Sequence, residues 1–123
     1  MTIYILEDDP QRMIKLRRHF IGDTIVHSDT AAEFIDALKE YDDPAPLDAI
    51  FLDHDLGGMQ FVDSSDTNTG MEVVRWMVEN KVNVGIIYVH TLNDLAGEIM
   101  VDKLQNAGYN TVRLPFIYMN FEL

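Results

Sequence analysis

Short apolar runs alternate along this chain with longer segments of helical periodicity, and no other feature constrains its fold as strongly. The run Leu47–Leu52 is almost continuously apolar, which is typical of a strand covered on both faces. Strands that alternate with helices predict a parallel sheet with helices on both faces. We expect strands over residues 2–6, 24–27, 47–52, 82–89 and 111–114, and helices over about residues 10–20, 30–41, 70–79 and 94–106.

The ends of these helices carry their own signals. Asp9 followed by Pro10 is a typical helix start, with an N-cap and a proline in the first turn. The segment 30–33 has the form of a capping box, and Gly108 suits the position after a helix end. After Pro115 the chain leaves room for about two helical turns, so the last helix of the fold is expected to be short.

Length and composition limit the class of protein. The 123 residues suffice for a single domain, expected over residues 1–123, and not for two. The chain has no cysteine, which excludes disulfides, thiolate metal sites and cysteine nucleophiles. No apolar stretch approaches the length of a membrane span and no signal-like segment stands out, so we expect a cytoplasmic protein that does not enter a membrane.

The chain is strongly acidic, with 21 Asp and Glu against 9 Lys and Arg and a net charge of −12. An extensive interface with duplex nucleic acid needs Lys and Arg to displace counterions, so we do not expect one. The excess of acid has two interpretations. It can serve solubility, or it can include a cluster of carboxylates that binds a divalent cation.

Acidic and imidazole side chains gather at the ends of the predicted strands. In the flavodoxin-like strand order 2-1-3-4-5, strands one, three and four are neighbours, and ligands bind at their carboxyl ends. Carboxylates that meet there either share protons, with raised pKa values, or bind a hard cation such as Mg²⁺; we favour the cation. The residues concerned are Glu7, Asp8 and Asp9 after the first strand, Asp53, His54 and Asp55 after the third, His90 and Thr91 after the fourth, and Arg113 on the fifth.

These strand ends resemble the receiver domains of two-component response regulators. "YILEDDPQR" is similar to the acidic pair that ends the first receiver strand and holds Mg²⁺, here Glu7 and Asp8. "AIFLD" is similar to the strand that leads to the phospho-accepting aspartate, here Asp53, and "IIYVHT" to the strand that ends in Thr or Ser, here Thr91. "TGMEVVRWM" and "LPF" also resemble receiver segments. The resemblance covers the whole chain and implies a flavodoxin-like, receiver-like fold.

The departures from the receiver pattern are equally specific. The conserved receiver lysine falls on Leu114, with Arg113 one place earlier, and a polar insertion lengthens the loop that follows Asp55. The segments "LDHDLGG" and "VHT" resemble an offshoot of receivers found in bacteria and phages, the cyclic-phosphate-processing receiver-like domains. This resemblance implies a metal-dependent phosphoesterase that acts on a cyclic or terminal phosphate, such as a nucleotide or an RNA end.

Candidate roles can be given to each residue in such a reaction. His54 and His90 are the natural acid and base, Arg113 can clamp phosphate oxygens, and the Thr91 hydroxyl can donate a hydrogen bond. Other interpretations stay open: His54 can point away from the crevice, His90 can be a core residue, Thr91 a helix cap and Arg113 a surface residue. We expect Mg²⁺ or Mn²⁺ on Glu7, Asp8, Asp53 and Asp55, and catalysis by Asp53, His54, His90, Thr91 and Arg113.

Three functions remain as alternatives. The first is the phosphoesterase, with a phosphate-bearing small molecule or nucleic-acid end as its ligand. The second is a stand-alone receiver that is phosphorylated on Asp53. The third is a non-catalytic binding protein that uses the acidic crevice, with the polar loop 57–69 as the contact to a protein partner.

Overall fold

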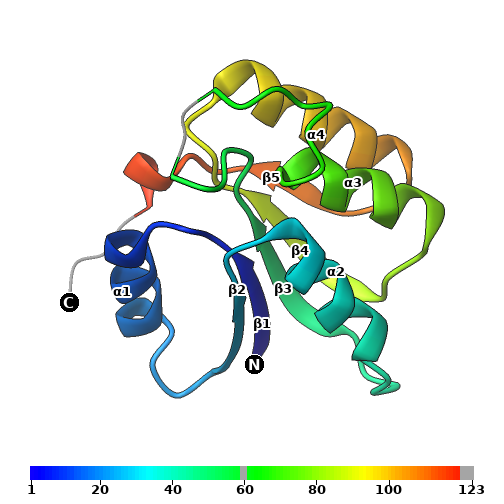
Figure 1. Ribbon diagram of the computed structural model, residues 1–123. Helices are drawn as coiled ribbons and strands as arrows, with labels where there is room; N and C mark the ends of the chain where they lie inside the picture. The colour runs from blue at the N-terminus through cyan, green and yellow to red at the C-terminus, as the bar shows by residue number, and fades with distance from the viewer. Residues whose placement is uncertain (59–60, 120–123) are drawn as a thin grey trace.

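The computed structural model describes residues 1–58 and 61–119, which form a five-stranded sheet in the order β2-β1-β3-β4-β5 (Figure 1). Every neighbouring pair of strands is parallel, so the predicted sheet and its strand order are confirmed. The strands are β1 (Thr2–Leu6), β2 (Thr24–Ser28), β3 (Leu47–Leu52), β4 (Val84–Val89) and β5 (Thr111–Arg113), and the helices are α1 (Pro10–His19), α2 (Ala31–Glu40), α3 (Gly70–Glu79) and α4 (Asp94–Asn106).

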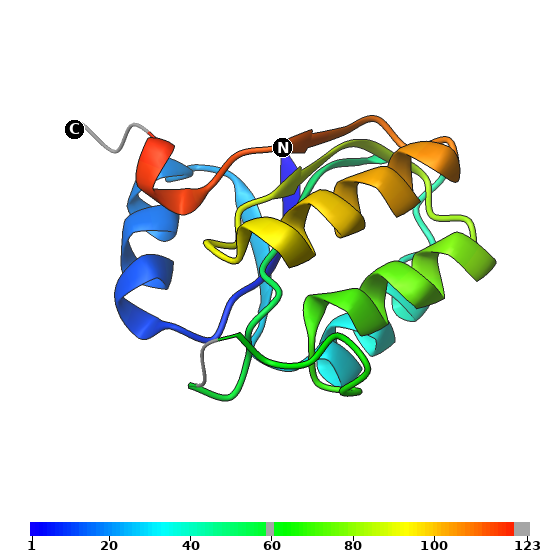
Figure 2. The same cartoon turned by 90° about the horizontal axis from the view of Figure 1, so that it is seen from above.

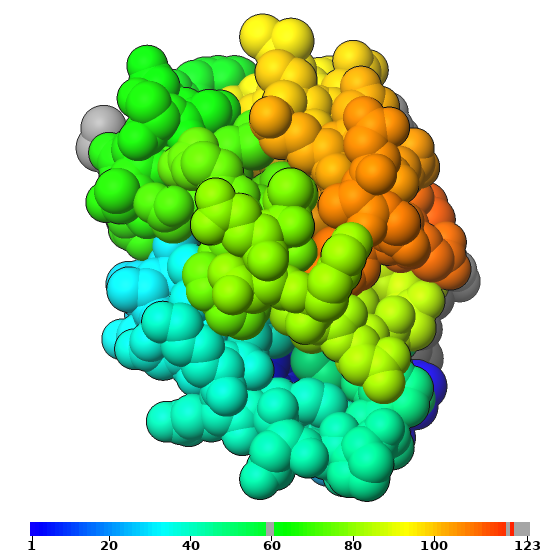
Figure 3. Space-filling model, turned by 90° about the vertical axis from the view of Figure 1, so that its right-hand side faces the viewer, coloured from blue at the N-terminus to red at the C-terminus, as the bar shows by residue number. Residues whose placement is uncertain are grey.

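The helices lie on both faces of the sheet but are divided unequally (Figure 2). Helix α1 covers one face together with the 3₁₀ turn η1 (Phe116–Tyr118). Helices α2, α3 and α4 cover the other face and lie side by side on it (Figure 3). None of the helices in the described part of the chain is both long and apolar enough to cross a membrane.

Alternation along the strands creates two apolar cores, one on each face, because successive side chains of a strand point to opposite sides. In β1, Ile3 and Ile5 pack in the core beneath α1, whereas Tyr4 and Leu6 pack in the core beneath α2 and α3. All four side chains are buried. The sheet is therefore held from both sides, and its carboxyl edge is the place where polar side chains collect.

Two elements differ from the sequence prediction by more than one residue at an end. Strand β4 begins at Val84, later than expected, because the amide of Val82 donates a hydrogen bond at 3.0 Å to the hydroxyl of Tyr109. At the C-terminus the described chain forms the single 3₁₀ turn η1 in place of two helical turns. Pro115 precedes this turn in an extended conformation, and the rest of the expected helix, residues 120–123, lies outside the described residues.

Candidate functional site

Three polar side chains meet where β1, β3 and β4 end. Leu6 pairs with Leu52, and Leu52 pairs with Val89, so the residues that follow these strands are neighbours along one edge. Those residues are Glu7, Asp53 and His90, which are 0%, 3% and 1% exposed. Ionisable groups with so little contact with water need partners.

Some of these partners belong to the trio Glu7, Asp53 and His90 itself. His90 Nε2 lies 3.0 Å from Glu7 Oε1, and Asp53 Oδ1 accepts a hydrogen bond from the amide of His54 at 2.8 Å. His90 Nδ1 is buried and has no hydrogen-bond partner among the described residues. An ionised carboxylate can only accept a hydrogen bond, so the Nε2–H of His90 donates to Glu7 Oε1.

A guanidinium from α1 completes this cluster. Arg12 Nη2 lies 3.1 Å from Glu7 Oε2 and 3.4 Å from Asp53 Oδ2, and thus bridges the two carboxylates. Its Cζ lies 5.8 Å from the centre of the Phe116 ring, a cation–π distance. Arg12 was not among the residues that sequence analysis selected. The signal that could have found it is its position on the first turn of a helix, five residues after Glu7.

Burial and these neighbours move the two pKa values in opposite directions. Burial raises the pKa of Asp53 to about 7, and the adjacent Glu7 adds to the rise, while His90 and Arg12 oppose it. Burial also acts to raise the pKa of Glu7, but the hydrogen bond with His90 and the charges of His90 and Arg12 outweigh it and hold the pKa at about 2. The pair therefore keeps one carboxylate ionised and the other close to titration at neutral pH.

The trio also fits a divalent cation. One ligand atom from each of Glu7, Asp53 and His90 can be chosen such that all lie within 4.8 Å of one another. A cation with ligands at about 2.1 Å places adjacent donors roughly 3 Å and opposite donors roughly 4.2 Å apart, so binding would draw the more widely separated of these atoms together. Carboxylate oxygens suit Mg²⁺ and Mn²⁺, and an imidazole shifts the preference towards Mn²⁺ and later metals.

A cavity of about 450 Å³ opens at this edge of the sheet. Asp8 lines it and accepts a hydrogen bond from the amide of Gly58 at 2.7 Å. Asp9 also lines it and caps α1, as predicted, by accepting from the amides of Gln11 and Arg12. The cavity is lined by Asp8, Asp9, Pro10, Arg12, Asp53, Asp55, Gly58, Phe61, Thr91, Leu92 and Asn93. Asp8 and Asp55, both predicted metal ligands, thus lie at the cavity but outside the trio.

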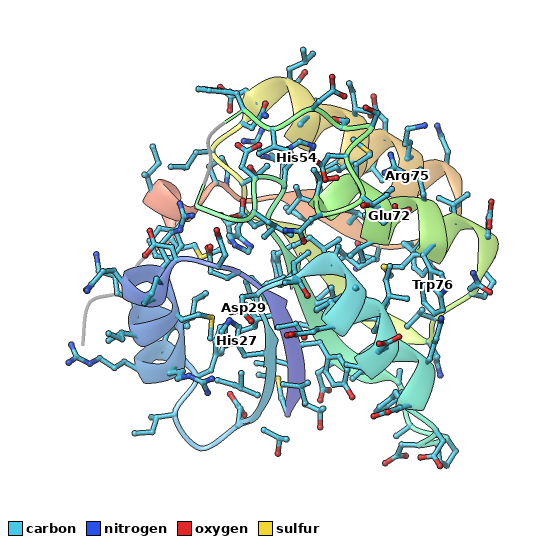
Figure 4. The ribbon with its side chains drawn as sticks, in the orientation of Figure 1. His27, Asp29, His54, Glu72, Arg75 and Trp76 are labelled. Atoms are coloured by element: carbon cyan, nitrogen blue, oxygen red, sulfur yellow. The ribbon has the colours of Figure 1, made fainter. Side chains whose placement is uncertain are left out.

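His54 is turned away from this trio. Its ring is fully buried, with Nδ1 at 2.8 Å from Asp55 Oδ1 and Nε2 at 2.9 Å from Ser64 Oγ. Figure 4 shows His54 among the coils of the loop that precedes α3. The same Asp55 oxygen accepts from the amide of Val62 at 2.8 Å. The open question about the direction of His54 is thereby answered: its ring ties this loop to the end of β3.

The loop is anchored at further points in its described part. Asp55 and Thr69 form an antiparallel bridge, and Asn68 Oδ1 accepts from the amide of Ala31 at 3.0 Å. Arg75 Nη1 donates to the carbonyl of Ser64 at 2.7 Å. The segment 61–69 is therefore tied to the end of β3, to α2 and to α3, and its Phe61 lines the cavity.

The two remaining predicted residues are in different surroundings. Thr91 lines the cavity, is 1% exposed, and accepts a hydrogen bond from the amide of Asn93 at 3.2 Å. The cap of α4 is Asn93, whose side chain accepts from Ala96, so the interpretation of Thr91 as that cap is wrong. Arg113 is not among the residues that line the cavity; its Nη2 donates to the carbonyl of Thr91 at 2.6 Å and to Asp94 at 2.9 Å.

Comparisons with known proteins identify the family and agree with the fold. A family model described as "Cyclic-phosphate processing Receiver domain" matches residues 3–106. No curated protein matches the chain significantly.

Solved structures with the same fold include a sensor protein from Polaromonas sp. JS666, with 18% identity, a TM-score of 0.58, and coverage of 92% of this chain and 82% of that one. A signal receiver domain of a putative Luxo repressor protein from Vibrio parahaemolyticus has 20% identity and a TM-score of 0.58, with coverage of 98% and 80%. The Mn²⁺-bound response regulator Rcp1 has 16% identity and a TM-score of 0.59, with coverage of 93% and 79%. At such identities these three structures show a common fold and no more.

Proposed function

Because the chain belongs to the family of cyclic-phosphate processing receiver domains, we propose that it acts as a receiver that takes a phosphoryl group on Asp53. Asp53 follows the central strand β3 and lines the cavity at the carboxyl edge of the sheet, where ligands of open α/β sheets bind. The observation that carries the proposal is the meeting of this carboxylate with a second one, Glu7, and with the Arg12 cation.

In the proposed step, a carboxylate oxygen of Asp53 attacks the phosphorus of a small phosphodonor such as acetyl phosphate. A P–O bond to Asp53 forms while the bond between phosphorus and the acetate oxygen breaks. Acetate leaves with that electron pair, and the product is an aspartyl phosphate. The step needs no oxidant and no second substrate.

Glu7, Asp53 and His90 would hold Mg²⁺ or Mn²⁺, and the ion would supply positive charge for the phosphoryl oxygens. The chain's own groups orient the ligand. The Thr91 hydroxyl accepts from the amide of Asn93, which leaves its O–H available to donate to a phosphoryl oxygen.

Asp53 must be ionised before it can attack. Since burial raises its pKa to about 7, part of the population holds a proton on this carboxyl at neutral pH. Positive charge brought beside a carboxylate favours its ionised form. Cation binding would therefore ionise Asp53 for the attack, in addition to supplying positive charge for the phosphoryl oxygens of the ligand.

The opening of a cyclic phosphate by water is a second candidate, and His90 is the observation that favours it. Its buried ring lies beside Glu7 in the trio and leaves Nδ1 without a partner among the described residues. In this reaction the water oxygen bonds to phosphorus, one ring P–O bond breaks, a base takes the water proton, and the freed oxygen gains a proton. His54 has both ring nitrogens engaged, so these transfers would fall to His90.

The charge of the chain supports a small ligand in either reaction. With a net charge of −12, the protein would bind an extended duplex weakly, because backbone contacts depend on basic residues. A phosphate-bearing small molecule or an exposed nucleic-acid end needs only the local charge of the cavity.

Phosphorus NMR of the wild type and of Asp53→Asn separates the two candidates. Both proteins are given Mg²⁺ or Mn²⁺ with acetyl phosphate and then with a 2′,3′-cyclic nucleotide. A protein-bound acyl-phosphate signal that is lost in Asp53→Asn supports the receiver. Turnover of the cyclic phosphate, also lost in the variant, supports the esterase. No change of either compound overturns both and leaves the binding protein.

A further inference from the structure

We infer that Arg12 is an internal counter-ion of the carboxylate pair which a divalent cation displaces, and that the freed guanidinium then binds the phosphoryl oxygens of the ligand. The inference rests on the proposed function for its second half only. Its two halves predict opposite changes in two affinities, which no purely structural role of Arg12 would produce.

Arg12 lies between the two carboxylates. Nη2 contacts Glu7 Oε2 and Asp53 Oδ2, and Nε lies 2.9 Å from Glu7 Oε1. These two carboxylates also provide two of the three ligands of the predicted cation site. A divalent ion and a guanidinium compete for the same oxygens and repel each other, so the ion's arrival would release Arg12 from at least part of this bridge.

The guanidinium of Arg12 is incompletely hydrogen-bonded where it lies. Nε is close to Glu7 but its N–H is not directed at the oxygen, and this buried atom has no hydrogen-bond partner among the described residues. Unmet donors at a buried position are unfavourable. An anion with several acceptor oxygens would satisfy this group better than the present arrangement does.

Arg12 can reach a ligand without a large movement. Its side chain is 24% exposed and lines the 450 Å³ cavity together with Asp53 and Thr91. Once released from the carboxylates, the guanidinium could turn towards a ligand in the cavity, while the Phe116 ring beside it supports the cation. The planar fork of arginine also matches two oxygens of a phosphate at once.

Among the described residues, the cavity has no cationic side chain besides Arg12. Of the described residues that line it, Arg12 alone is basic, against the acidic Asp8, Asp9, Asp53 and Asp55. Arg113 is held by Asp94 and the Thr91 carbonyl and is not among the lining residues. Beside a bound metal ion, Arg12 is therefore the one cationic group among these lining residues that can meet a phosphoryl group in this acidic cavity.

The test compares Arg12→Gln and Arg12→Lys with Arg17→Gln, which removes one positive charge from an exposed position on the same helix. Calorimetric titration with Mg²⁺ should show that Arg12→Gln binds the ion about tenfold more tightly than Arg17→Gln, since only the former loses the competing cation. Titration of the Mg²⁺-saturated proteins with inorganic phosphate should show binding weakened at least tenfold in Arg12→Gln, or about 1.4 kcal/mol. The Mg²⁺ and phosphate affinities of Arg12→Lys should lie between those of Arg12→Gln and Arg17→Gln.

Each contrary result has a distinct meaning. If Arg12→Gln lowers both affinities together with the unfolding temperature, Arg12 is structural and the inference is wrong. If the Mg²⁺ affinity of Arg12→Gln equals that of Arg17→Gln, the counter-ion half fails. If the Mg²⁺-loaded wild type binds no phosphate, the proposed function and the binding of phosphoryl oxygens by Arg12 fail together. An increased Mg²⁺ affinity in Arg12→Gln would still establish Arg12 as the counter-ion.

Discussion

Gly70, the first residue of α3, lies directly against the main-chain carbonyl of Asp53: a Cβ on Gly70 would come within 1.8 Å of that oxygen. The Gly70 amide also donates to the carbonyl of His54 at 3.0 Å. The start of α3 therefore holds the main chain of the candidate phosphoryl acceptor in place. Backbone cannot yield to such a contact as a flexible side chain can.

Replacement of Gly70 by alanine should therefore be severely destabilising. We expect Gly70→Ala to lose about 3 kcal/mol or more of unfolding free energy, because the new methyl group cannot fit without a shift of the backbone at Asp53. Urea unfolding followed by circular dichroism measures the loss.

Gly97→Ala in α4 provides the matched control. Its Cβ would approach the Arg113 guanidinium at 2.7 Å, but that group ends a flexible side chain, so the clash would weaken its bonds to Thr91 and Asp94 and leave the backbone in place. Alanine also gains about 1 kcal/mol over glycine inside a helix, so the net change should be small. Equal losses in the two variants would refute the backbone contact at Gly70.

The stability of the metal-free protein should depend on pH through Asp53. Because the folded pKa is raised from 3.8 to about 7, the folded state holds an additional proton between these values. Its unfolding free energy should therefore decrease as pH rises from about 4 to about 7, by roughly 2–4 kcal/mol for this one group. Glu7, whose pKa is lowered to about 2, contributes the opposite slope, a loss as pH falls below about 4.5.

Asp53→Asn isolates the first of these slopes. The difference in unfolding free energy between this variant and the wild type should change with pH between 4 and 8, in buffer that contains EDTA. A constant difference over that range would contradict a raised Asp53 pKa.

His54 should be needed for the order of the loop before α3. His54→Ala removes both hydrogen bonds of the buried ring and leaves a cavity, so we expect a loss of about 2–4 kcal/mol. Ser64→Ala removes one bond and should cost about 1 kcal/mol. Hydrogen exchange of the Val62 amide, which donates to Asp55, should accelerate in His54→Ala. Unchanged exchange would show that the loop is held by its other contacts.

His90 should decide which cation is preferred. His90→Gln is expected to weaken Mn²⁺ binding about tenfold more than Mg²⁺ binding, because imidazole is a better ligand for transition metals than for Mg²⁺. Calorimetric titration of both ions measures the ratio, and His19→Gln on exposed α1 serves as the control. Equal losses for the two ions would mean that His90 does not contact the metal.

Much of the fold follows from local signals in the sequence. The bounds 47–52, 70–79 and 94–106 agree with the observed elements, because apolar runs and helix starts are properties of neighbouring residues. The receiver resemblance is confirmed by the family model over residues 3–106. The contributions of all the predicted site residues to metal binding or catalysis stay predictions.

The sequence by itself determined which residues share the carboxyl edge of the sheet, since parallel strands in a known order place Glu7, Asp53 and His90 side by side. Only the tertiary structure decided what each side chain faces. His54 turns towards Ser64, Asp94 binds Arg113, and Arg12 reaches Asp53 across 41 positions of sequence. These contacts depend on how helices and loops from other parts of the chain pack. A long side chain takes its direction from those neighbours, and no local pattern encodes them.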